Sequence, residues 1–137
     1  MSARRSSILL ALETALLATF VADAPLCALV RGRIHGGSPR GPVLPYLAFA
    51  EARCGDFSSG DGDGAAVALT LEAVTDDGDR ARALAIVDAA LERALGADLT
   101  LTVGAMVLLK GGETRLERSR DGKGWRATVV LNALVDG

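Results

Sequence analysis

The chain has 137 residues, of which 50% are hydrophobic and 23% are charged, and its formal net charge is −2. This length and composition fit one domain with an ordinary hydrophobic core, and they indicate neither a disordered chain nor a repeat array. The small acidic balance argues against a protein that grips nucleic acid over its whole surface, because such binding needs clustered cations. We therefore expect one domain over residues 1–137.

An amphipathic helix is expected near the N-terminus. Four apolar side chains recur there at helical spacing, as in a helix that lies on a core: Leu9, Leu12, Leu16 and Phe20. The same segment imitates a signal peptide, because Arg4 and Arg5 precede it and Ala22-Asp23-Ala24 has the form of a cleavage site. Glu13 interrupts the apolar stretch, which favours the helix of a cytoplasmic protein and argues against a membrane span. A secreted domain stays open as the alternative.

Glycine and proline divide the next part of the chain. Residues 36–42 are rich in both, cannot hold regular structure, and precede an expected strand over residues 45–52. A polar loop of glycine, serine and aspartate follows over residues 54–64, and we expect it to be mobile or ordered by a partner. Apolar residues alternate with small or polar ones over residues 66–75, which predicts a second strand whose apolar face carries Val67, Leu69, Leu71 and Ala73.

A second helix is predicted from about Asp79 to Leu95. The aspartates just before it can accept hydrogen bonds from the first backbone N–H groups, and Gly96 is a suitable stop. Its expected apolar stripe consists of Leu84, Val87, Leu91 and Leu95.

The last third of the sequence predicts a long hairpin. Residues 106–110 are apolar, residues 113–120 are densely charged, and Asp121-Gly122 is a turn signal. The terminal strand alternates cleanly, with its apolar positions at Trp125, Ala127, Val129, Leu131, Ala133 and Val135. The charged distal part is too polar to pack on the core of the same chain, so we expect it to project.

The charged part of this hairpin is the main candidate site. It carries Glu113, Arg115, Glu117, Arg118, Arg120 and Lys123. One interpretation is a solvated pair of strands. The other is an arm that docks on a neighbouring subunit through salt bridges and strand addition. The sequence does not decide between them.

Reactive side chains do not cluster in the sequence. His35 lies beside glycines with no acidic or thiol partner nearby, so we expect a loop or edge residue rather than a base or ligand. Asp56, Asp61 and Asp63 are spaced like ligands of a hard cation, but Ala65 stands where another ligand is needed, which favours a solvated linker. Cys27 and Cys54 have no CxxC spacing; a disulfide stays open, and two partly buried thiols are the expectation. We expect no catalytic site, cofactor or metal.

Several weak motifs together resemble one known family. They are the helix end Ala22-Asp23-Ala24-Pro25-Leu26, the stretch over residues 29–34, the strand entry Leu44-Pro45-Tyr46-Leu47 after a glycine-rich turn, the helix over residues 83–95, and the hairpin with Asp121-Gly122. In this order they resemble the small phage tail completion proteins, or tail terminators, which also occur in gene transfer agents.

The resemblance implies a fold and a function. The implied fold is α/β (α+β): a mixed or mainly antiparallel sheet of four to five strands, two helices packed on one face, and the projecting charged hairpin. The implied protein is not an enzyme but a virion component assembled in the bacterial cytoplasm. It forms a hexameric ring that caps the tail tube, stops its polymerisation and meets a head-completion (stopper or adaptor) protein. DNA passes through the lumen as non-specific cargo, no membrane is involved, and the loop with Asp56, Asp61 and Asp63 becomes ordered on docking to the tube.

Other classes of protein stay open at this point. The nearest is another tail tube or head–tail joining component of a phage-like particle. A secreted small α/β binding domain is the second, if the N-terminal segment is a signal peptide. A small-molecule binding module or minor enzyme, with a pocket built from residues that do not cluster in sequence, is the third.

Overall fold

The computed structural model of the chain describes residues 2–37, 39–41, 43–56, 64–76 and 78–136, with side chains from Ser7 onward. Its elements follow in the order α1 (Ser2–Val21), α2 (Ala24–Val30), β1 (Ile34–His35), β2 (Tyr46–Asp56), β3 (Gly64–Val74), α3 (Arg80–Gly96), β4 (Ala105–Arg118) and β5 (Trp125–Asp136). The aspartates Asp61 and Asp63 of the polar loop lie outside the described residues. The α+β fold and the mixed sheet expected from the sequence are confirmed.

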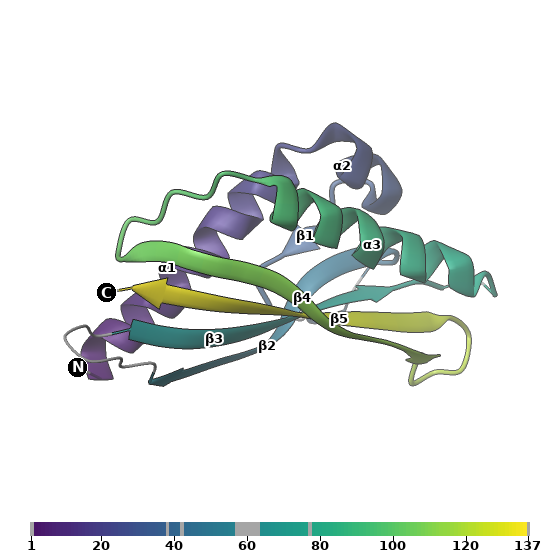
Figure 1. Cartoon of the computed structure of the whole chain (residues 1–137). Helices are drawn as coiled ribbons and strands as arrows, with labels where there is room; N and C mark the ends of the chain where they lie inside the picture. Colours follow the sequence, from purple (N-terminus) through teal and green to yellow (C-terminus); the bar gives the residue numbers. More distant parts are fainter. Residues whose placement is uncertain (1, 38, 42, 57–63, 77, 137) are drawn as a thin grey trace.

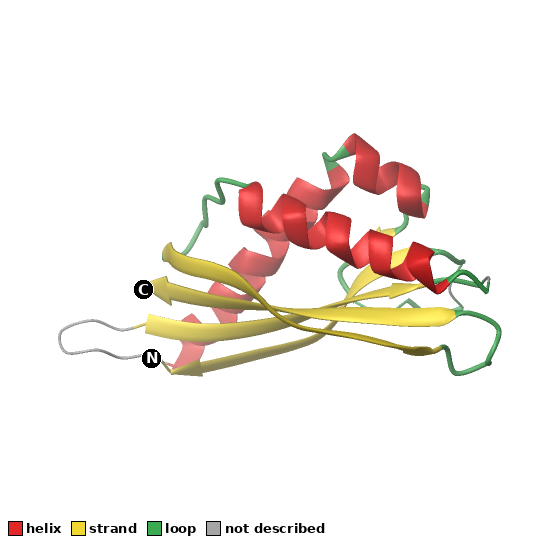
Figure 2. Cartoon of the chain, turned by 45° about the vertical axis from the view of Figure 1, so that its right-hand side comes forward, coloured by secondary structure: helices red, strands yellow, loops and turns green. Residues whose placement is uncertain are grey.

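The five strands form one sheet in the order β1-β2-β3-β5-β4 (Figure 1). The short strand β1 runs parallel to β2, and every other neighbouring pair is antiparallel. All three helices lie on the same face of this sheet, and the opposite face carries no helix (Figure 2). We call that uncovered face the open face.

The hydrophobic core fills the layer between the helices and the sheet. Helix α1 buries Ile8, Leu12, Leu16 and Phe20, as its spacing predicts except that Ile8 replaces the half-buried Leu9. The alternating patterns of β3 and β5 are also confirmed, because Val67, Leu69, Leu71 and Ala73 are buried, as are Ala127, Val129, Leu131, Ala133 and Val135. Clean alternation fixes which side chains point toward the helices, since neighbouring side chains in a strand point to opposite faces.

Helix α3 packs through three alanines together with Ile86 and Val87, so Val87 of the predicted stripe is confirmed as buried and the three leucines are not. The buried residues are Ala83, Ile86, Val87, Ala90 and Ala94. Leu84 and Leu91 are half-buried, and Leu95 is 47% exposed. The prediction followed the largest apolar side chains, whereas alanines allow the helix axis to come close to the sheet. Gly111 on β4 has the same role, because a Cβ there would lie 3.0 Å from Leu91 Cδ1.

A third helix, α2, was missing from the predicted pair. Asp23 does not end the first helix but begins the next one, because its carboxylate accepts a hydrogen bond from the Leu26 N–H at 3.1 Å and Pro25 follows in the first turn. No single described helix is long and apolar enough to cross a membrane. The segment Ser7–Val21 and α2 reach the required length and composition only as a pair, with an 87° bend between them.

The charged hairpin is part of the sheet, and the projecting arm is not observed. Strands β4 and β5 pair from Ala105↔Asp136 to Arg118↔Trp125, and β5 continues to pair with β3 as far as Arg126↔Val74. The charged strand can remain in the sheet because its polar side chains point to the open face rather than into the core. The sequence prediction considered packing on one side of the strand only.

Candidate functional site

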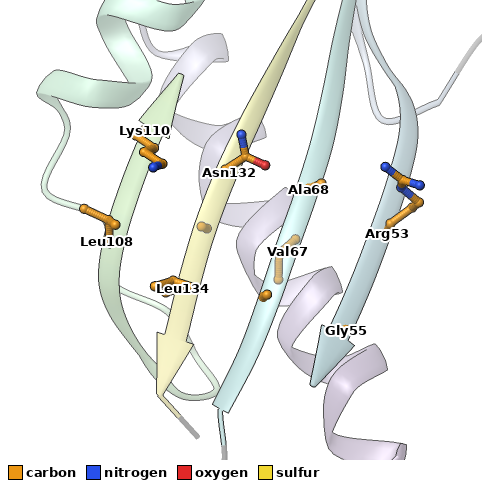
Figure 3. A pocket seen from close by; sticks show the side chains of 10 residues that line it. Arg53, Gly55, Val67, Ala68, Leu108, Lys110, Asn132 and Leu134 are labelled. Carbon is orange, nitrogen blue, oxygen red and sulfur yellow. The ribbon is translucent and has the colours of Figure 1, made fainter. Parts of the chain in front are cut away.

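The candidate site is the open face of the sheet and the two strands at its edges. One half of this face is largely apolar and forms a shallow hollow of about 370 Å³ across β2, β3, β5 and β4 (Figure 3). Ala66 and Ala68 on β3 contribute small side chains, which leave the floor low, and Leu108 and Leu134 form an apolar wall. Leu108 is 45% exposed, so this wall presents a large apolar side chain to the surroundings.

Cations flank the apolar hollow on both sides. Arg53 projects from β2 and Lys110 from β4, with the amide of Asn132 between them on β5 (Figure 3). The arrangement combines an apolar floor with polar rims, which is the general anatomy of a protein interface.

The other half of the open face is charged. A second hollow, about 300 Å³ in volume, is lined by both acids and bases: Glu51, Arg53, Glu113, Arg115, Glu117 and Arg126. Two of the contacts within this set join side chains two residues apart on one strand. Arg53 lies 3.8 Å from Glu51, and Arg115 lies 3.8 Å from Glu113. All four of these side chains are exposed, so each contact is weak and each charge is available to another molecule.

One network at this end of the face is partly buried. Arg126 Nε donates to Glu72 Oε1 at 2.7 Å, and Arg126 Nη1 donates to Glu117 Oε1 at 2.6 Å. Glu72 is 6% exposed and Arg126 35% exposed. The hydrogen bond to Glu72 is the main reason that the pKa of Arg126 rises above its ordinary value. Burial, followed by the Glu72 charge, raises the pKa of the neighbouring Tyr46 phenol.

The predicted site residues fall into two groups. Glu113, Arg115 and Glu117 lie together on the open face of β4, where the structure adds Glu51, Arg53 and Arg126 to them. Arg118 is directed elsewhere, and its guanidinium lies 4.7 Å from the centre of the Trp125 ring. Arg120 and Lys123 are exposed in the turn between β4 and β5, and Asp56 is exposed at the end of β2.

The turn itself is held by Asp121. Its carboxylate accepts hydrogen bonds from the Lys123 N–H at 3.0 Å and the Ser119 hydroxyl at 2.7 Å, and these bonds lower the pKa of its carboxyl. Asp121-Gly122 was therefore correctly identified as the turn signal. The fixed turn holds Arg120 and Lys123 at the end of the sheet.

The sequence prediction missed Glu51, Arg53, Glu72 and Arg126 as parts of the site. The signal that could have found them is the two-residue period. Glu51 and Arg53 share a face of β2, and Arg126 lies on the polar side of the alternating strand β5. The pairing of Glu72 with Arg126 joins positions 54 residues apart, and no local pattern shows such a pairing.

The remaining residues with reactive side chains are His35, Cys27 and Cys54, and they do not lie together in one site. His35 lies on the edge strand β1, as expected, with its ring 5.8 Å from the Tyr46 ring. Cys27 and Cys54 are half-buried and are not joined by a disulfide, and the Cys27 thiol donates to the Val21 carbonyl at 3.2 Å. Among the described residues, no group of three or more histidine, cysteine, aspartate or glutamate side chains is arranged to hold a metal ion.

Comparisons with known proteins point in one direction. A family model described as tail completion protein gp17 matches residues 14–136. Among solved structures, a chain in the virion of a native gene transfer agent particle is 30% identical, with a TM-score of 0.86 over 95% of this chain and 98% of that chain. No curated protein matches the sequence.

Proposed function

This chain belongs to the tail completion protein gp17 family, and on that premise we propose that it is a ring-forming tail terminator of a phage-like particle. In this role it caps the tail tube, stops polymerisation of the tube and joins the tail to a head-completion protein. The observation that carries the proposal is the likeness to a gene transfer agent virion chain over nearly the full length of both chains.

The surfaces of the subunit support a role in assembly. A subunit of a closed ring needs two different side surfaces that fit each other, because each copy contacts one neighbour on either side. Strand β4, at one edge of the sheet, exposes Glu113, Arg115 and Glu117, and β2 exposes Glu51 and Arg53 toward the other edge. The charged side chains of both sets are exposed to solvent. The proposed contacts are therefore polar, and they involve the residues that the sequence singled out on β4.

The turn and the polar loop are assigned to contacts with other partners. Arg120 and Lys123 in the β4–β5 turn are exposed at one end of the sheet, and Asp56 lies on β2. We assign the turn to contacts with a tail tube or head-completion protein, since it lies beyond the paired strands. Asp61 and Asp63 belong to this proposal by sequence alone.

The charge of the chain suits a ring through which DNA moves. A lumen lined with many unopposed cations would hold the duplex through its phosphates. This chain has 15 lysines and arginines against 17 aspartates and glutamates, and acids accompany the bases on its open face. DNA then passes as cargo and not as a specific ligand.

Loss of the protein from particle-producing cells tests the proposal. Tails without a terminator are expected to vary in length, to exceed the normal length and to lack heads, and the wild-type gene supplied in trans is expected to restore them. Electron microscopy of the released particles measures both features. Tails of normal length joined to heads would contradict the proposal. An absence of all tails would instead indicate a tube component, and headless tails of normal length would indicate a joining protein.

A further inference from the structure

Among the described residues, each edge of the sheet includes a stretch of strand that has no neighbouring strand on its outer side. Among the described residues, β4 pairs with β5 only, so its outer edge carries no strand. On the other side, β1 pairs with β2 only at Leu47 and Ala48, and the described part of the chain places no strand beside β2 from Phe49 to Asp56. Exposed strand edges offer backbone N–H and C=O groups that another strand can pair with.

Strand direction determines how two copies can meet at these edges. From β2 to β3, β5 and β4, each strand is antiparallel to the one before it, so β2 and β4 run in opposite directions. If two copies stand side by side in the same orientation, β4 of one therefore meets β2 of the next as an antiparallel pair. Antiparallel ladders are slightly more stable per residue than parallel ones. The contact is also heterologous, as a closed ring requires.

Charge selects a register for this pairing. On the open face β4 carries Glu113 and then Arg115, and β2 carries Glu51 and then Arg53. An antiparallel pair that places Arg115 opposite Glu51 also places Glu113 opposite Arg53, so both cross-strand pairs are attractive. A shift of two residues in either direction places like charges opposite each other, which disfavours pairing.

A β-bulge directly precedes Glu51 on β2, and a second one on β4 includes Glu113. The register of β2 shifts between Phe49 and Glu51, and that of β4 shifts between Gly111 and Thr114. Bulges interrupt a regular ladder and help to fix its register. In the register that pairs Arg115 with Glu51, the positions outside both bulges are Arg115 opposite Glu51 and Thr114 opposite Ala52. Glu113 belongs to the β4 bulge and lies beside Arg115 on the charged half of the open face.

We propose that residues 113–115 of β4 pair antiparallel with residues 51–53 of β2 in a second copy of this chain, so that the sheet continues from one subunit to the next. This inference rests on the proposed ring and names the seam between its subunits. Ala52 and Thr114, both exposed, lie opposite each other in the same register, on the side of the seam away from the charges.

A charge swap tests the seam. Arg115→Glu and Glu51→Arg each replace an attractive pair by a repulsive one, and each is expected to raise the concentration for half-assembly at least about tenfold. The double variant restores opposite charges and is expected to return within about threefold of the wild type. Arg80→Glu and Glu92→Arg, at exposed positions on α3, are matched controls that leave assembly unchanged. Circular dichroism and urea unfolding verify that each variant is folded.

A cross-link tests the register directly. In a background with Cys27→Ser and Cys54→Ser, Ala52→Cys with Thr114→Cys is expected to give a ladder of covalent oligomers on a non-reducing gel. Ala52→Cys with Thr102→Cys, another exposed position, is the control and gives none. Rings that form without rescue by the double swap and without the cross-link would overturn the seam and leave the ring intact. A wild-type protein that is monomeric at every concentration would overturn both the seam and the ring.

Discussion

Arg126 on β5 connects two strands of the open face, since its guanidinium lies 2.7 Å from the Glu72 carboxylate on β3 and 2.6 Å from the Glu117 carboxylate on β4. It therefore ties the edge strand β4 to the centre of the sheet. The proposed subunit contacts on β4 depend on the position of that strand, so Arg126 supports the interface from within the sheet, and Glu117 belongs both to this network and to the proposed contact surface.

Removal of Arg126 is expected to destabilise the fold more than removal of the Glu117 charge. Arg126→Ala takes away the cation beside a carboxylate that is only 6% exposed, and we expect a loss of about 2–3 kcal/mol. Glu117→Gln changes a side chain that is 59% exposed and should cost less than about 1 kcal/mol. Urea unfolding of both variants measures the difference. Equal losses of unfolding free energy would show that the buried contact between Arg126 and Glu72 contributes no more than the exposed contact between Arg126 and Glu117.

Gly124 is expected to tolerate no side chain. A Cβ at this position would collide with the backbone carbonyl of Thr75, and it would lie 2.9 Å from Asp76 Cα. Because these neighbours are backbone atoms, Gly124→Ala should cost about 2–4 kcal/mol in unfolding free energy. Gly96→Ala is the matched control, since nothing lies within 4 Å of its added Cβ. A Gly124→Ala protein as stable as the control would contradict this close approach of the β4–β5 turn to the residues that follow β3.

Glu13 gives a pH dependence with a defined sign. Burial in α1 raises the pKa of its carboxyl above 4.5, so the charged form is disfavoured in the folded state. The unfolded chain then releases this proton at lower pH, and the free energy of unfolding falls as pH rises from about 4.5 through the folded pKa. Glu13→Gln should accordingly raise the melting temperature by about 1–3 °C at pH 7.

The same gain should disappear below pH 4.5, where Glu13 is protonated in both states. Glu92→Gln, at an exposed position on α3, is the control for the effect of a Glu→Gln substitution in a helix. Melting curves across this pH range measure both variants. A gain of equal size at every pH would mean that the effect of Glu13→Gln is not due to titration.

The sequence correctly predicted those parts of the fold whose buried face follows from a short repeating pattern of apolar residues. The two-residue alternation in β3 and β5 and the helical spacing in α1 each specify a buried face, and those faces were confirmed. The α3 stripe was wrong in detail because Ala90 and Ala94, not Leu95, meet the sheet. The size of the apolar side chains alone does not show which of them lie where a helix comes closest to the sheet.

The rest of the site depends on pairing between distant segments. Strand β1 has two residues, too few for a pattern, and it exists because Ile34 and His35 pair with β2. Glu72 and Arg126 meet only once β3 and β5 are in register. The charged residues of β4 were identified from sequence, but their place within the sheet depends on β5 and β3, which a one-strand argument does not include.

The mass of the native protein tests the central claim most directly. Light scattering of the purified full-length chain across a concentration series, followed by particle imaging, determines its assembly state. The account predicts a six-fold ring of about 85 kDa, formed from six chains of 14.1 kDa. A mass of 14.1 kDa at every concentration, with no rings in the images, would contradict it.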